Sequence, residues 1–127
     1  MIRCDLIGLF KLSYSLRMKL PEDTLIAREK LSHYLLVQKK RNDKSQWLAQ
    51  AGYTLENWQV LETDERNLIL STDATLIERT EYGQMYEING ALAGPNGKIL
   101  AVRTIWMTEN ATGNTKFITM YPNKRGK

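Results

Sequence analysis

The chain has 127 residues, with 18 lysines and arginines against 14 aspartates and glutamates, and its length suits one domain with its own core. A net charge of +4 is compatible with a polyanionic partner such as RNA, although many ordinary domains are as basic. Cys4 and His33 are the only cysteine and histidine, which excludes an internal disulfide and a zinc site built from such residues. We therefore expect a cytoplasmic protein without a bound metal.

Residues 1–17 are interpreted as an N-terminal extension. Charges at Asp5, Lys11 and Arg17 interrupt their apolar residues, which argues against a signal peptide and a membrane span. Met18 begins a segment that resembles a second start, so we expect one domain over residues 18–122, followed by a basic tail over residues 123–127. The extension is predicted to be dispensable for folding.

Three helices are predicted in the first half of the chain, over residues 27–37, 43–52 and 54 to about 67. Leu31 and Leu35 have helical spacing among good helix formers. Asp43 and Thr54 are residue types that cap the free N–H groups at a helix start, and Gly52 ends the second helix.

From residue 75 the apolar period changes to two, which predicts strands over residues 76–80, 84–92, 99–108 and 116–121. Gly94-Pro95-Asn96-Gly97 predicts a tight hairpin turn. Gly90 lies too near this turn to form another, so we expect a bulge or a close backbone approach there. The predicted fold is α+β, with about three helices on one face of a four-stranded antiparallel sheet and the other face partly free.

The common catalytic motifs are absent: there is no GxxxxGK[ST], GxGxxG, GxSxG or HExxH sequence. What remains is a set of basic and hydroxyl side chains suited to binding a phosphate. The set is Lys44, Arg103, Thr104, Lys116, Thr119 and Tyr121.

Arg103 lies inside a run of β-branched and aromatic residues, where burying a charge is costly unless it is paired. One explanation is a salt bridge to Glu87 or Glu78 on a neighbouring strand, and the other is a functional role. Alternation along the strand does not decide which face is buried.

On the last strand, Thr119 and Tyr121 share one face while Ile118 and Met120 share the other. The apolar pair is expected to face the helices. Thr119 and Tyr121 would then line a groove on the open face.

Four short sequences carry a resemblance to a bacterial domain family of unknown function: Glu81-Tyr82-Gly83-Gln84, Gly94-Pro95-Asn96-Gly97, Val102-Arg103-Thr104 with Trp106, and Thr119 with Tyr121. That family occurs as small stand-alone proteins and at the C-termini of large polymorphic toxins. The resemblance covers about residues 19–122, and it implies a fold similar to the barnase/EndoU/colicin/RelE-like ribonucleases, whose open sheet face binds RNA.

The resemblance implies a toxin of a toxin–antitoxin or polymorphic toxin system that cleaves RNA without a metal or cofactor. Lys44, Arg103 and Thr104 match family positions, whereas His33 replaces a commonly acidic residue and the loop before Lys44 departs from the family pattern. The 2′-hydroxyl would attack the adjacent phosphate, and cationic groups would stabilise the dianionic transition state.

The expected catalytic residues are Lys44, Arg103, Thr104, Thr119 and Tyr121, and the expected RNA-binding residues are Lys39, Lys40, Arg41 and Lys116. Lys44 and Tyr121 are the candidates for moving protons, and a small acidic antitoxin or immunity protein is the expected protein partner.

A non-catalytic module that binds protein or nucleic acid through the same sheet face remains the alternative. A groove lined by Arg103, Lys44 and Tyr121 favours the enzyme. An apolar patch without converging polar groups favours the module.

Overall fold

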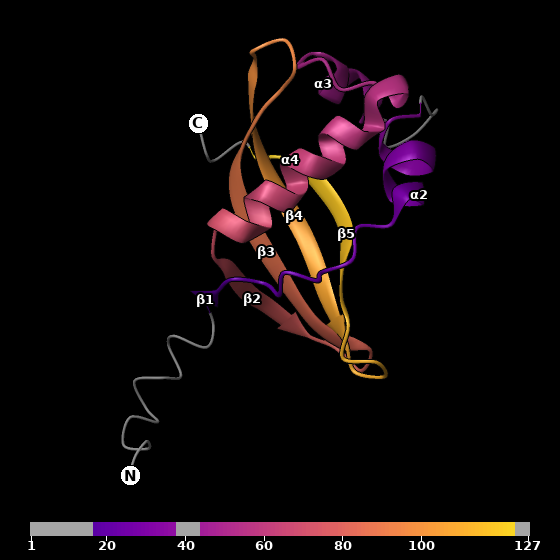
Figure 1. The fold of residues 1–127 in the computed structure, drawn as a ribbon. Coiled ribbons are helices and arrows are strands. Elements are labelled where there is room, and N and C mark those ends of the chain that lie inside the picture. Colours follow the sequence, from indigo (N-terminus) through magenta and orange to yellow (C-terminus); the bar gives the residue numbers. More distant parts are fainter. Residues whose placement is uncertain (1–16, 38–43, 124–127) are drawn as a thin grey trace.

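The computed structural model describes residues 17–37 and 44–123, which form helices packed on an antiparallel sheet (Figure 1). The elements in chain order are β1 (Arg17–Met18), α2 (Arg28–Lys30), η1 (Leu31–Leu35), α3 (Ser45–Ala49), η2 (Leu55–Asn57), α4 (Trp58–Ser71), β2 (Ala74–Arg79), β3 (Gly83–Ala93), β4 (Ile99–Glu109) and β5 (Thr115–Pro122). The strands lie in the order β1-β2-β3-β4-β5, each antiparallel to its neighbour. The predicted α+β class and the four long strands are confirmed.

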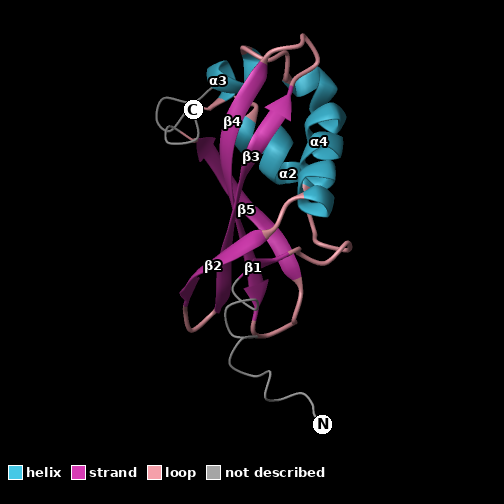
Figure 2. Cartoon of the chain, turned by 90° about the vertical axis from the view of Figure 1, so that its left-hand side faces the viewer, coloured by secondary structure: helices cyan, strands magenta, loops and turns pink. Residues whose placement is uncertain are grey.

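The helices cover one face of the sheet, as Figure 2 shows for α2 and α4. The first helix combines α2 with η1, where Leu36 N donates to the Leu31 carbonyl at 3.0 Å, a wider turn than in an α-helix. It buries Leu31 and Leu35, as their spacing predicts. α4 runs along the sheet and buries Leu61 and Ile69 on the face turned toward it.

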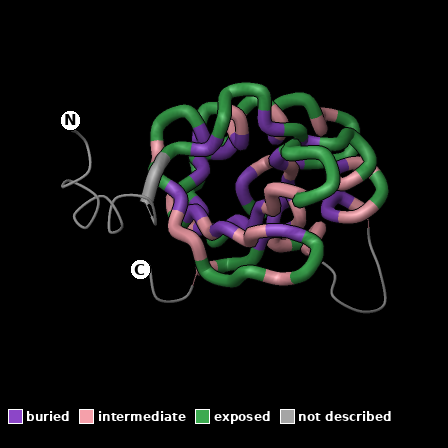
Figure 3. The backbone as a smooth tube through the Cα atoms, turned by 90° about the horizontal axis from the view of Figure 1, so that it is seen from below, coloured by how far each residue is buried: buried purple, intermediate pink, exposed green. Residues whose placement is uncertain are grey.

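The core lies between this helical layer and one face of β3, β4 and β5, and buried positions gather toward the interior of the fold (Figure 3). Trp106 is fully buried and meets the Phe117 ring edge-on, with 5.1 Å between centroids. Even-numbered residues of β4 face the helices, so Arg103 and Ile105 point to the opposite face. We call this opposite surface the open face.

Gly90 shows the predicted close approach rather than a bulge, because β3 pairs regularly with β4 through it. A Cβ at Gly90 would lie 2.7 Å from Cδ1 of Leu68 on α4. The 94–97 turn forms as predicted, with Gly97 N donating to the Gly94 carbonyl at 2.9 Å.

Several boundaries differ from the sequence-based prediction; α3, for example, spans Ser45–Ala49 rather than residues 43–52. The two-residue β1 adds a short fifth strand, and it includes Arg17, which we had placed in the extension. α4 continues to Ser71, four residues beyond the predicted end, because Leu68 and Ile69 remain against the core. Asn123 N donates to the Ala101 carbonyl at 2.9 Å, so pairing continues into the predicted tail.

The last strand also contains an irregularity that alternation did not predict. Ile105 pairs with Thr119 but Trp106 pairs with Phe117, so Ile118 is the extra residue of a bulge. Met120 faces the core as predicted, whereas Phe117 takes the second core position that we expected Ile118 to hold.

Candidate functional site

Lys44 lies at the start of α3 and reaches across to the edge strand β5. Its Nζ donates to Thr119 Oγ1 at 3.1 Å, although 75 residues separate the two in sequence. The same ammonium lies 4.3 Å from the centroid of the Tyr121 ring and 5.6 Å from that of Tyr34. The lysine is therefore held by one hydroxyl and two aromatic rings, and its charge is directed at the end of β5.

Contacts at the opposite end of α3 fix the position of Lys44. Leu48 and Ala51 are fully buried, and the Ala51 carbonyl accepts from Asn96 N at 3.3 Å in the β3–β4 turn. The Asn96 side chain adds a bond to the Gln50 carbonyl at 2.9 Å. This anchoring fixes the helix against one end of the sheet, which directs Lys44, the residue just before the helix, toward β5.

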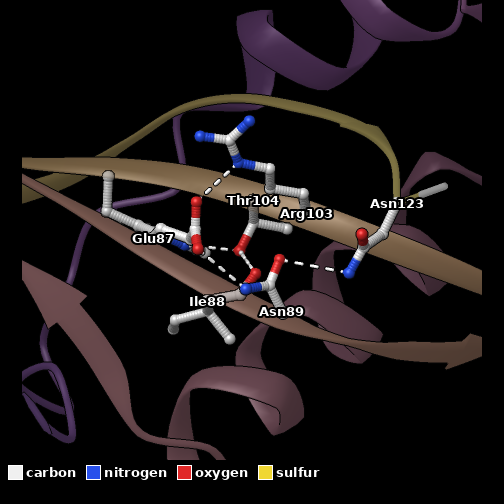
Figure 4. Close-up of polar contacts among 7 residues, drawn as sticks. Glu87, Ile88, Asn89, Arg103, Thr104 and Asn123 are labelled. Carbon is white, nitrogen blue, oxygen red and sulfur yellow. Dashed lines mark hydrogen bonds and ion pairs between the residues drawn. The ribbon is translucent and has the colours of Figure 1, made fainter. Parts of the chain in front are cut away.

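Arg103 belongs to a polar network on the open face that joins β3, β4 and the end of the described chain (Figure 4). Its Nε donates to Glu87 Oε1 at 2.6 Å, and Asn89 Nδ2 donates to the other oxygen of Glu87 at 2.8 Å. Asn123 Nδ2 in turn donates to Asn89 Oδ1 at 3.2 Å. Only Nε of the guanidinium is bonded within the described residues, which leaves its two terminal nitrogens to contact a ligand.

The register of β3, β4 and β5 places Thr119 and Tyr121, the partners of Lys44, on the same face as the Arg103 network. Arg103 pairs directly with Tyr121, and Ile105 pairs with Thr119 and with Glu87. Directly opposite residues of antiparallel strands project from the same face. Arg103, Thr119 and Tyr121 therefore converge on the open face around Ile105.

Thr104 occupies a different environment from the other predicted catalytic residues. Its side chain is fully buried on the helical face, where its hydroxyl donates to the Ile88 carbonyl at 3.1 Å. It also accepts from Trp106 Nε1 at 2.7 Å. The structure does not bring Thr104 together with Arg103, because adjacent strand residues point to opposite faces.

Of the predicted RNA-binding residues, Lys116 lies within the described part of the chain. Lys116 Nζ donates to Glu109 Oε2 at 2.7 Å beside the β4–β5 turn. This contact, with a bond from Thr112, lowers the pKa of Glu109 from its ordinary value. Lys39, Lys40 and Arg41 lie outside the described residues.

Residues 17–124 match the family described as Domain of unknown function (DUF6883). The chain belongs to this family. The matched range contains Lys44, Arg103, Thr119 and Tyr121, so these site residues lie inside the DUF6883 domain. No match was found among curated proteins.

A solved structure with the same general fold comes from a contact-dependent growth inhibition toxin–immunity protein complex of Klebsiella pneumoniae 342. It aligns with a TM-score of 0.59 and 15% identity, over 79% of this chain and 100% of that chain. At this identity the likeness establishes the fold of the DUF6883 domain alone.

Several members of this site are not included in the sequence analysis. Glu87 was considered only as a salt-bridge partner for Arg103, and the contact of Tyr34 with Lys44 was not foreseen. Alternation places Glu87 and Asn89 on one face of β3, so the period-two pattern could have paired both with β4. The Tyr34 contact depends on helix packing, which the sequence pattern does not reveal.

Two acidic residues of α4 have unusual surroundings away from the open face. Glu65 is fully buried, neither of its carboxyl oxygens has a hydrogen-bond partner among the described residues, and burial is the main cause that raises its pKa. Asp64 accepts from the Tyr53 hydroxyl at 2.6 Å, and burial followed by this contact raises the pKa of Tyr53.

Two cavities in the described part of the chain lie away from the open face. One of about 190 Å³ is lined by residues of α4 and β3, and one of about 290 Å³ lies beside α3. No three His, Cys, Asp or Glu residues within 17–37 and 44–123 are grouped to hold a metal ion. No helix in these ranges is long and apolar enough to cross a membrane.

Proposed function

We propose that this DUF6883 domain is a metal-independent endoribonuclease toxin whose site is the open face beside β5. The observation that carries the proposal is the position of Lys44, held 3.1 Å from Thr119 and 4.3 Å from the Tyr121 ring centroid. Arg103 is the cross-strand partner of Tyr121, so two cationic side chains flank the same strand end. A phosphodiester is the ligand that best suits this arrangement.

The reaction would be attack of a ribose 2′-hydroxyl on the adjacent phosphate, which leaves a 2′,3′-cyclic phosphate. Its transition state carries extra negative charge, and fixed cations stabilise such charge more than they stabilise the ground state. The terminal nitrogens of Arg103 would contact the phosphate oxygens bidentately, while Lys44 would donate a further bond. Thr104 would contribute indirectly, by holding β3 and β4 together beneath the site.

A toxin role is supported by the solved structure with a similar fold, whose title names a toxin and its immunity protein. The basic residues near Lys44 in the sequence also suit an RNA substrate, since Lys39, Lys40 and Arg41 stand shortly before it. A small acidic antitoxin or immunity protein would neutralise the domain by covering the same cations.

A non-catalytic binding module is the second candidate, and one observation favours it. Arg103 already pairs with Glu87, which satisfies part of its charge. An open sheet face with such a pair could bind RNA or a protein without changing it.

Incubating the purified domain with total RNA in the presence of EDTA tests the proposal. The wild type should cut RNA, and Arg103→Ala should cut about a hundredfold more slowly, equivalent to about 3 kcal/mol of transition-state stabilisation. Induced expression should arrest growth in the wild type but not in Arg103→Ala. If RNA stays intact, or if Arg103→Ala and Lys44→Ala cut as fast as the wild type, the binding module takes the place of the enzyme.

A further inference from the structure

Glu87 is a carboxylate held within the cationic site. Its side chain is 19% exposed, against 46% for Arg103, so it lies below the guanidinium but still reaches the surface. Arg103 donates to one of its oxygens and Asn89 donates to the other, which fixes the carboxylate plane. An ionised carboxylate has about four lone-pair positions, so these two bonds leave room for another donor.

The proposed cleavage needs a group that accepts the proton of the attacking 2′-hydroxyl. Lys44 in its ammonium form has three donors and no acceptor, so it suits the protonation of the leaving oxygen. The hydroxyl of Thr119 already accepts a hydrogen bond from Lys44. An ionised carboxylate is an acceptor only, so Glu87 is chemically suited to the remaining role.

The register separates these two groups in the manner that the reaction requires. Glu87, Ile105 and Thr119 form one row across β3, β4 and β5. Neighbouring strands lie about 4.8 Å apart, so the backbones at the two ends of this row are roughly 10 Å apart. Attack and departure take place on opposite sides of phosphorus, and a phosphate bound between the two ends of this row would have Glu87 on one side and Lys44 on the other.

We infer that Glu87 is the general base of the proposed ribonuclease and that Lys44 is its general acid; the inference rests on the proposed function. The 2′-hydroxyl proton moves to a Glu87 oxygen as the bond from O2′ to phosphorus forms. The bond from phosphorus to O5′ breaks, and O5′ takes a proton from Lys44. The products are a 2′,3′-cyclic phosphate and a 5′-hydroxyl, after which Glu87 releases its proton to water and Lys44 regains one.

Glu87→Gln distinguishes a base from a residue that only positions Arg103. The amide oxygen can still accept from Arg103 Nε, but it does not take up a proton at neutral pH. We expect cleavage to fall by a factor on the order of 10² to 10⁴. The decline of kcat/KM at low pH, which protonation of the base causes in the wild type, should disappear.

Binding of an RNA with 2′-O-methyl groups, which cannot be cut, supplies a second readout. The Glu87→Gln variant should bind this RNA at least as tightly as the wild type, because a negative charge beside the phosphate has been removed. Glu78→Gln is the matched control, since Glu78 is an exposed carboxylate on β2. Its cleavage rate and pH profile should equal those of the wild type.

Each outcome decides the inference. If the wild type cuts RNA while Glu87→Gln retains its rate and pH profile, the inference fails and the proposed function stands. If Glu87→Gln loses RNA binding in proportion to cleavage, Glu87 only positions Arg103 and the inference is wrong. A wild type that cuts no RNA removes the proposed function and the inference together.

Thermal unfolding establishes whether the Gln variant is folded. If it is not, Glu87→Asp replaces it, because aspartate keeps a carboxylate that is one methylene shorter. A slower enzyme that retains the low-pH decline supports the inference. An Asp variant with the full wild-type rate, or one without that decline, overturns it.

Discussion

Lys44 shows how a single side chain defines the proposed site. Its Nζ contacts Thr119 and the rings of Tyr34 and Tyr121, which come from η1 and β5. These contacts restrict a side chain that otherwise has many conformations, and less conformational entropy is then lost when a phosphate binds. The aromatic contacts therefore preorganise the cation.

Lys44→Met removes the charge while keeping much of the side-chain volume. We expect RNA cleavage to fall on the order of a hundredfold, because one transition-state donor is lost. Lys98→Met is the control, since Lys98 is exposed in the β3–β4 turn region and its Nζ donates to Gln50 Oε1 at 3.4 Å. Cleavage rates measured under single-turnover conditions should differ between the two variants. Equal rates would show that Lys44 takes no part in the reaction.

Thr104 should affect stability rather than chemistry. Thr104→Val keeps the shape but leaves Trp106 Nε1 without its acceptor, and an unsatisfied buried donor costs about 1–3 kcal/mol. Urea unfolding should show this loss, whereas Thr104→Ser should retain most of the stability. The cleavage rate per folded molecule should equal that of the wild type. A lower rate would show that Thr104 takes part in catalysis.

Glu65 should make stability depend on pH. Burial, with a smaller contribution from Glu62, raises the pKa of Glu65 well above its ordinary value, while Arg66 lowers it. The folded state therefore holds the proton more tightly than the unfolded chain, so the free energy of unfolding falls as pH rises above about 4.3. Below that pH both states are protonated and the penalty vanishes.

Glu65→Gln should remove this pH dependence. The variant should gain stability over the wild type at pH 8 and much less at pH 5, measured by urea unfolding at both values. The exposed Glu78→Gln serves as the control and should change little at either pH. An equal effect of Glu65→Gln at both pH values would show that the carboxyl is not retained in its protonated form.

At the scale of elements, the β3–β4 turn fixes α3. A Cβ at Gly94 would lie 2.0 Å from the Ala51 carbonyl oxygen, whereas nothing lies within 4 Å of a Cβ at Gly97. Gly94→Ala should therefore separate α3 from the sheet and displace Lys44, lowering both the melting temperature and cleavage. Gly97→Ala meets only the strain of its positive φ and should cost less. Equal melting temperatures for the two variants would contradict this role of Gly94.

The strands were predictable because their signals are local. β-branched residues at period two, together with the 94–97 turn, were sufficient to locate β3 and β4 to within one or two residues. The capping residues were less informative. Asn57 stands where a capping box usually has Glu, yet its Oδ1 accepts from Thr54 N at 2.7 Å and so takes the role of the Glu. The end of α4 was missed because packing of Leu68 and Ile69, rather than local propensity, extends the helix to Ser71.

The site was only partly predictable, because its geometry depends on long-range packing. Residue types suitable for a phosphate identified Lys44 and Arg103, and alternation placed Thr119 with Tyr121. Sequence alone did not decide which face of β4 is buried, so Thr104 was grouped with its neighbour Arg103 although the two point in opposite directions. The bulge at Ile118 was equally hidden, since nothing local requires it.

At the scale of the whole molecule, a net charge of +4 should attract an acidic inhibitor as well as RNA. If such a partner covers the open face, Arg103→Glu should weaken its co-purification with the domain. Lys98→Glu makes the same charge change away from the site and should have a smaller effect. A partner that binds both variants equally tightly would have its interface elsewhere.

The chemical ends of the RNA products test the central claim most directly. A site without a metal that uses the 2′-hydroxyl as nucleophile must leave a 2′,3′-cyclic phosphate on one fragment and a 5′-hydroxyl on the other. Mass spectrometry of a short RNA cut by the wild type in EDTA should find these two ends, and replacing the attacking 2′-hydroxyl with hydrogen should stop the reaction. Fragments with 3′-hydroxyl and 5′-phosphate ends, or an RNA left intact, would contradict the account.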